Sequence, residues 1–183
     1  MPLSRQSEPW RGLAQPWLGL DVGTRRIGVA LSNTLGIAQP LLTIERTQPR
    51  RDQRSILRLA RRHACAGIIV GNPLHLSGDR SPQTERVHRF VDELKALIAE
   101  MSPEANENVS DADHPNFTVH LWDERLSTAE VHAALDATDR HPADRQIRRQ
   151  ARTAIVDKLA AALILQGWLD AQSGSVTLLP PGP

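Results

Sequence analysis

Acidic residues occupy three positions in this chain where a carboxylate is least expected. Asp21 closes the apolar run Trp-Leu-Gly-Leu, and Asp157 interrupts an apolar segment that has helical spacing. The pair Asp123 and Glu124 ends a third apolar run. Burying a carboxylate is costly unless it is paired or holds a metal ion. Each acid taken alone is more often structural, but the three positions together suggest a shared chemical task.

Binding a divalent metal ion is the task that fits these acids. Acids at the ends of two central strands and on one packed helix can meet at a single edge of a sheet. Mg²⁺ takes oxygen ligands and keeps several waters, and two metal ions about 3.5–4 Å apart can activate a water for phosphodiester hydrolysis. Bound metal would also relieve the repulsion between the carboxylates. The structural alternative is that Asp157 simply pairs with Arg25 or Arg26.

A glycine-rich turn follows the first of these acids, in the segment Gly19-Leu-Asp-Val-Gly-Thr-Arg-Arg-Ile-Gly28. Gly23 permits a tight turn, Thr24 offers a hydroxyl, and Arg25 and Arg26 are placed to meet a backbone phosphate. A plain hairpin would also use Gly and Thr. The turn alone therefore leaves phosphate binding undecided.

The elements that would position these residues follow from hydrophobic spacing and turn residues. Ser81 followed by Pro82 predicts a helix start, because Ser caps a helix and Pro suits its first position. An arginine-rich loop is expected before the last helix. The predicted order is β-β-β-α-β-α-β-α-α, an α/β fold whose mixed sheet begins with three antiparallel strands and carries helices on both faces. The expected strands are 17–21, 27–32, 37–44, 66–70 and 117–122, and the expected helices are 52–63, 82–98, 127–135 and 153–169.

Composition predicts one globular domain in a reducing compartment. The chain has 183 residues, of which 40% are hydrophobic and 23% charged. The single Cys65 excludes an internal disulfide. No apolar run suits a signal peptide or a membrane span, so a cytoplasmic protein is expected. We expect an N-terminal extension at 1–16, one domain at 17–170 and a proline-rich tail at 171–183.

The net charge of +1 does not indicate nucleic-acid binding, but the distribution of charge is uneven. Seven arginines lie between Arg46 and Arg62, and five lie between Arg140 and Arg152. Solvated helix faces explain such runs about as well as a nucleic-acid surface does.

Four motifs in this chain resemble those of the YqgF (RuvX-like) family. The glycine-rich segment from Gly19 to Gly28 is followed by Ile-Ile-Val-Gly71-Asn-Pro-Leu, then by Asp123-Glu-Arg-Leu-Ser-Thr128, and then by Val156-Asp-Lys-Leu-Ala-Ala-Ala-Leu-Ile-Leu-Gln-Gly167. They occur in the family's order between about residues 17 and 170. The chain departs from the family at Asn72, where Leu or Met is usual, and in using arginine where lysine is frequent before the last helix.

The resemblance implies a ribonuclease-H-like fold related to Holliday-junction resolvases of the RuvC kind. It also implies a divalent-metal nuclease, using Mg²⁺ or Mn²⁺, that matures the 5′ end of precursor 16S rRNA. By position, Asp21 is the first-strand acid, Glu124 is preferred over Asp123 as the second-strand acid, and Asp157 is the helix acid. We expect Asp21, Glu124 and Asp157 to be catalytic, and these three with Asp123 to be the metal ligands.

The expected partner is a structured nucleic acid, either precursor ribosomal RNA or branched DNA. Arginine suits phosphate because its planar guanidinium makes paired hydrogen bonds. Such contacts position a substrate without reading its sequence. The residues expected to contact phosphates are Thr24, Arg25, Arg26, Arg125, Arg145, Arg148, Arg149 and Arg152.

Three other functions compete with that of a ribosomal RNA nuclease. A Holliday-junction-resolving DNA endonuclease would use the same metal chemistry. A catalytically silent RNA-binding protein would be favoured if Asp21 or Asp157 were missing, and both are present. A sugar-kinase or actin-like ATPase also begins with an Asp-X-Gly-Thr turn, but it needs a second domain and an adenosine motif that this sequence lacks.

Overall fold

The computed structural model describes residues 15–73, 81–101, 117–123 and 145–174, the last range with side chains from residue 155 onward. The helix expected at 127–135 lies outside these ranges, as do residues 1–14 and 175–183 of the two terminal segments. Residues 171–174, which were expected in the tail, are instead the end of the last helix. No described helix is long and apolar enough to cross a membrane.

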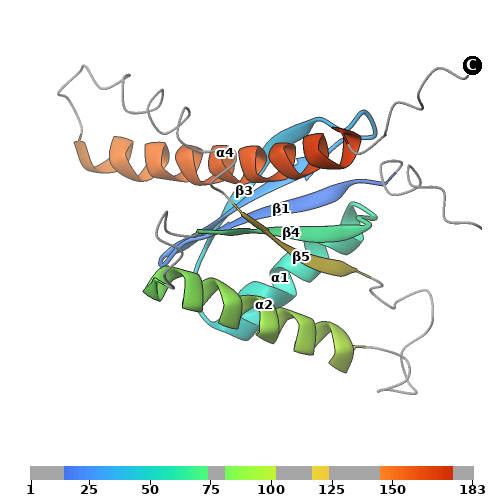
Figure 1. The fold of residues 1–183 in the computed structure, drawn as a ribbon. Coiled ribbons are helices and arrows are strands. Elements are labelled where there is room, and N and C mark those ends of the chain that lie inside the picture. Colours follow the sequence, from blue (N-terminus) through green and yellow to red (C-terminus); the bar gives the residue numbers. More distant parts are fainter. Residues whose placement is uncertain (1–14, 74–80, 102–116, 124–144, 175–183) are drawn as a thin grey trace, which may run out of the picture.

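Five strands form one mixed sheet in the order β3-β2-β1-β4-β5. The first three strands pair antiparallel, whereas β4 pairs parallel with β1 and β5 pairs parallel with β4 (Figure 1). The expected three-strand meander followed by α/β units is therefore confirmed. The strands are β1 (Trp17–Val22), β2 (Arg26–Ser32), β3 (Ala38–Glu45), β4 (Gly67–Asn72) and β5 (Thr118–Asp123).

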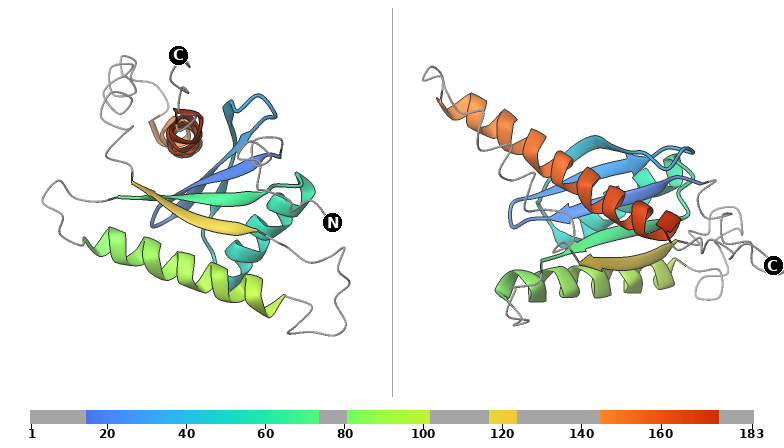
Figure 2. Two further views of the ribbon diagram at one scale, coloured as in Figure 1. Left: turned by 45° about the vertical axis from the view of Figure 1, so that its right-hand side comes forward. Right: turned by 45° about the horizontal axis from the view of Figure 1, so that its top comes forward.

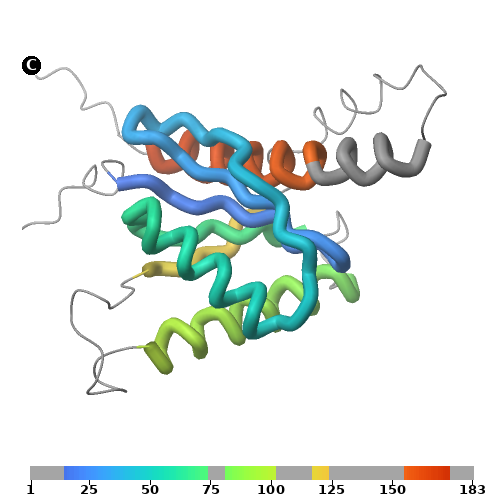
Figure 3. The backbone as a smooth tube through the Cα atoms, turned by 180° about the vertical axis from the view of Figure 1, so that it is seen from behind, coloured from blue at the N-terminus to red at the C-terminus, as the bar shows by residue number. Residues whose placement is uncertain are grey.

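Helices cover both faces of the sheet, as the sequence predicted. The first two helices, α1 (Pro49–Arg62) and α2 (Pro82–Glu100), lie on one face, and α4 (Arg145–Gly174) crosses the other (Figures 1 and 2). Viewed from behind, α1 lies in front of the sheet, α2 runs below it, and α4 lies on the far side (Figure 3). This mixed sheet between helical layers is the ribonuclease-H-like architecture.

Alternation along β1 divides the core into two clusters. Leu18, Leu20 and Val22 pack with buried residues of α1 and α2. Trp17 packs instead with buried residues of α4. Because successive strand residues point to opposite faces, the odd-numbered positions of β1 face α4.

The start of α2 follows the predicted capping pattern. Ser81 lies outside the helix in an extended conformation, and its Oγ accepts a hydrogen bond of 3.1 Å from the backbone N–H of Thr84. Pro82 takes the first helical position, where its missing N–H costs nothing.

The prediction of a loop from Arg145 to Arg152 was wrong, because this segment is the first part of α4. Its arginines were interpreted as a loop signal, but arginine, glutamine and alanine are all good helix formers. The last proline before the segment is Pro142, and no glycine follows until Gly167. Nothing in the segment therefore stops the helix from starting well before Thr153.

Two glycines allow the backbone of α4 to lie directly on the sheet. A Cβ at Gly19 would stand 2.6 Å from Leu165 Cβ and 2.8 Å from the carbonyl oxygen of Ala161. A Cβ at Gly28 would overlap the carbonyl oxygen of Asp157. Any side chain at these positions would push the helix away from β1 and β2.

We predict that Gly28→Ala lowers the free energy of unfolding by about 1–3 kcal/mol, because the added methyl group meets helix backbone rather than a movable side chain. Urea denaturation followed by circular dichroism measures the change. Gly36→Asn is the matched control: Gly36 has φ 74° and open space within 4 Å of the position that a Cβ would take, and Asn tolerates that conformation. An unchanged midpoint for Gly28→Ala would contradict the close approach.

Candidate active site

The first-strand acid and the helix acid lie next to each other at one edge of the sheet. Asp21 is the register partner of Gly28 across β1 and β2. The backbone of α4 at Asp157 rests on Gly28, as the overlap of a Cβ there with the Asp157 carbonyl shows. Asp21 shares its face of β1 with Gly19, which α4 also covers. The structure thus brings Asp21 and Asp157 to one place from opposite ends of the chain.

Asp157 pairs with Arg26, one of the two partners that the sequence left open. The Nε of Arg26 donates a hydrogen bond of 2.9 Å to Asp157 Oδ2. Both side chains are mostly buried, with relative exposures of 19% for Arg26 and 21% for Asp157. The Nη1 of Arg26 also lies 3.7 Å from the carboxylate of the exposed Glu45. Arg25, by contrast, is exposed on the turn.

Burial raises the pKa of Asp157 above its ordinary value. The charge of Arg26 and its hydrogen bond oppose this rise in pKa, and the negative charge of Glu45 adds to it. The folded protein holds this proton more tightly than the unfolded chain does. The contribution of Asp157 to stability therefore falls as the pH rises from the ordinary carboxyl range through the raised pKa.

The other strand acid that the sequence proposed as a metal ligand, Asp123, lies on the opposite face of the sheet. Its register partner is Asn72, whose Oδ1 lies 3.2 Å from His88 Nε2 on α2. The preceding residue, Trp122, packs against the cluster under α4. Because side chains alternate along a strand, Asp123 is on the α2 side, away from Asp21 and Asp157.

Several predicted site residues cannot be placed with their side chains. Glu124 and Arg125 lie outside the described residues, and Arg145, Arg148, Arg149 and Arg152 are placed only as backbone positions on α4. Within the described ranges, no group of three His, Cys, Asp or Glu side chains is arranged to hold a metal ion. The described part of the site is therefore a pair of carboxylates with an attached arginine.

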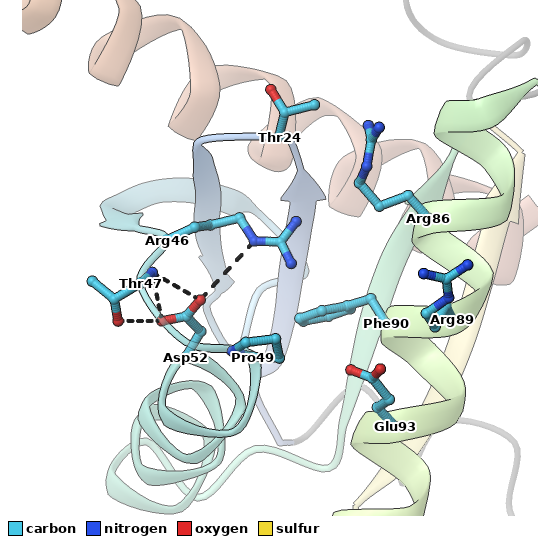
Figure 4. Close-up of a pocket in the computed structure, with 9 residues that line it drawn as sticks. All are labelled: Thr24, Arg46, Thr47, Pro49, Asp52, Arg86, Arg89, Phe90 and Glu93. Carbon is cyan, nitrogen blue, oxygen red and sulfur yellow. Dashed lines mark hydrogen bonds and ion pairs between the residues drawn. The ribbon is translucent and has the colours of Figure 1, made fainter.

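A pocket that the sequence did not predict lies below the turn between β1 and β2 (Figure 4). It has a volume of about 450 Å³, and Thr24 of the turn forms part of its wall. The remaining lining comes from α2, from α1 and from the segment that joins β3 to α1. Three of its lining residues are arginines, namely Arg46, Arg86 and Arg89.

The fold and the meeting of a strand acid with a helix acid at its edge define a protein of the ribonuclease-H-like class. The family description that matches residues 15–171 reads "RuvX: Holliday junction resolvase". The chain belongs to this RuvX family, as its four motifs predicted.

Named relatives are similar to this chain over most of its length. A protein of Roseiflexus sp. (strain RS-1) is 40% identical over 167 residues, which is 91% of this chain and 98% of that protein. One from Myxococcus xanthus (strain DK1622) is 36% identical over 155 residues, which is 84% of this chain and 87% of that protein. Both bear the name "Putative pre-16S rRNA nuclease". A solved structure of T. thermophilus RuvC with a Holliday junction substrate has 13% identity and a TM-score of 0.48, covering 88% of this chain and 97% of that one.

We predict that Arg26→Gln raises the pKa of Asp157 further, because it removes the cation that favours the ionised carboxylate. Glu45→Gln should shift the same pKa downward by a smaller amount, since Glu45 is exposed and its charge is screened. Carboxyl ¹³C NMR titration of the metal-free protein measures both shifts. Arg25→Gln serves as the control and should leave the titration unchanged. A pKa of Asp157 that does not respond to Arg26→Gln would refute the pairing.

Proposed function

We propose that this protein is a divalent-metal-dependent nuclease that hydrolyses phosphodiester bonds in precursor 16S rRNA during maturation of its 5′ end. The observation that carries the proposal is the juxtaposition of Asp21 and Asp157 at the edge of the sheet, held by the backbone contact at Gly28. The names borne by the relatives support ribosomal RNA as the substrate.

The chemistry of the two described carboxylates suits Mg²⁺ or Mn²⁺. Both ions favour oxygen ligands, and burial makes an unpaired negative charge at Asp157 unfavourable. Asp21, Glu124 and Asp157 would hold the metal, which when bound supplies a polarised phosphate and an activated water. Arg26 would then exchange its contact with Asp157 for one with a substrate phosphate.

Strand alternation favours Glu124 over Asp123 as the second-strand acid. Asp123 is on the α2 face with Asn72, whereas Trp122 is on the α4 face. If β5 continues with the same pleat, Glu124 returns to the face that carries Asp21 and Asp157. Asp123 would then serve the fold rather than the metal, which revises the expectation that it is a ligand.

Substrate phosphates would be held by cations on both sides of this acidic edge. Thr24 and Arg25 belong to the turn after β1, Arg26 begins β2, and Arg125 follows Glu124 in sequence. Arg145, Arg148, Arg149 and Arg152 recur at the three- and four-residue spacing of one side of a helix. The protein would act on precursor ribosomal RNA in the cytoplasm.

Resolution of Holliday junctions is the second candidate function, and the family description favours it directly. Branched DNA presents the same phosphodiester chemistry to the same carboxylates, so the acids do not separate the two functions. The distinction depends on how the arginines fit an RNA precursor or a four-way junction.

We predict that Asp21→Asn and Asp157→Asn each reduce metal-dependent cleavage by at least about 100-fold, since several kcal/mol of charge stabilisation are lost. Glu124→Gln should do the same, whereas Asp123→Asn should retain most activity. Single-turnover cleavage rates with Mg²⁺ or Mn²⁺ measure the effect, and circular dichroism checks folding. Wild-type rates for Asp21→Asn or Asp157→Asn would rule out the assigned site.

Side-by-side cleavage of a precursor 16S rRNA fragment and a four-way DNA junction separates the two substrates. We expect faster single-turnover cleavage of the RNA precursor at equal enzyme and metal concentrations. Faster cleavage of the junction would favour the resolvase function. Binding of RNA without cleavage of either substrate would point to a catalytically silent RNA-binding protein.

A further inference from the structure

The pocket below the turn between β1 and β2 has no part in the cleavage site described above, although it adjoins the same edge. Thr24, in its wall, is three residues after Asp21. The acids lie on the α4 face of the sheet, whereas α2 and the start of α1 line the pocket on the other face. The turn separates the two sites, and a strand of nucleic acid lying across it would reach both.

Arg46 is held in a fixed position in this pocket. Its Nη1 donates a hydrogen bond of 2.9 Å to the carbonyl oxygen of Gly23, and its Nε lies 4.0 Å from Asp52 Oδ2. The guanidinium also sits 5.9 Å from the centre of the Phe90 ring (Figure 4). These contacts place the charge of Arg46 before any ligand arrives, so little ordering is needed on binding.

The other two arginines come from α2, one helical turn apart. Arg86 donates to Gln83, whose Nε2 in turn donates a hydrogen bond of 2.8 Å to the carbonyl oxygen of Val22. Arg89 is exposed and has no hydrogen-bond or ion-pair partner within the part of the chain that the structure describes. The pocket therefore combines an anchored cation with an available one.

Two carboxylates also line the pocket, and both are engaged. Asp52 is buried and accepts hydrogen bonds of 3.2 Å from the backbone N–H of Thr47 and 3.1 Å from its hydroxyl, besides its ion pair with Arg46. Glu93 accepts a hydrogen bond of 3.0 Å from Gln53 Nε2. Three arginines against two occupied carboxylates leave a net positive pocket.

We propose that this pocket binds a backbone phosphate of the substrate, on the same strand as the scissile phosphate and across the turn from it. The proposal rests on the proposed nuclease function, which supplies the nucleic acid. Guanidinium groups match the oxygens of phosphate through paired hydrogen bonds. A stacked base is disfavoured, because Phe90 is only 2% exposed and offers no open ring face.

The test measures binding of an RNA hairpin to the full chain carrying Asp21→Asn, so that cleavage does not interfere. Adding Arg86→Ala and Arg89→Ala should weaken the Kd about tenfold and reduce the slope of log K against log salt by about 1. Arg54→Ala with Arg58→Ala is the matched control, since it removes two exposed arginines of α1. Equal effects of the two double variants would overturn the proposal.

Neutral methylphosphonate linkages placed one at a time along the hairpin then locate the contact. A neutral linkage at one position other than the scissile bond should weaken binding to the parent protein, which carries Asp21→Asn alone. The same linkage should not weaken binding further in the variant that also carries Arg86→Ala and Arg89→Ala. If no linkage behaves in this way, the proposal fails. A different result is that no linkage has the expected effect while inorganic phosphate or a nucleoside monophosphate raises the Tm of the parent but not of the double variant. That combination of results would identify the pocket as a small-anion site instead.

Failure of the pocket proposal can be distinguished from misfolding of a variant and from failure of the proposed nuclease function. If the double variant does not fold, Arg89→Ala alone replaces it, because Arg89 is exposed. If the wild-type chain cleaves no substrate, the proposed nuclease function is refuted, but the comparison of RNA binding between the variants can still be made. Normal cleavage with no effect of the pocket arginines on binding would refute the pocket alone.

Discussion

The contact between the backbone of α4 and the glycines of β1 and β2 is the constraint on which the rest of the site depends. Gly19 and Gly28 bring the helix closer than any side chain would permit. That closeness puts Asp157 beside the strand pair that carries Asp21. Because interiors are close-packed, one added methyl group there would shift the helix rather than compress it. The position of Asp157 relative to Asp21 therefore depends on the absence of side chains at Gly19 and Gly28.

The charges around this contact offset the cost of burying Asp157 only in part. Asp157 is mostly hidden from water, and Arg26 offsets only part of the cost, since the pKa stays raised. A carboxyl group whose pKa is shifted by burial and by a specific charged partner is a common feature of functional sites.

The sequence was sufficient for the sheet, the cap at Ser81, and the convergence of Asp21 with Asp157, because these follow from periodicity and from the cost of burying a carboxylate. It could not choose between Asp123 and Glu124, since a one-residue shift reverses the face of a strand. The register of Asp123 with Asn72 places Asp123 on the α2 face, and this supports the proposal of Glu124 as the second-strand acid. The arginine pocket was missed because Arg46 and Arg86 are forty residues apart in the chain and meet only in the fold.

The length of α4 has a mechanical consequence. Its thirty residues make a rod of roughly 45 Å at 1.5 Å per residue, and its N-terminal part extends past the sheet (Figure 1). Asp157 lies twelve residues from the start of this rod, where the helix backbone rests on Gly28. A displacement of the overhang relative to the sheet would be carried along the helix to its backbone contact with Gly28, beside Asp157.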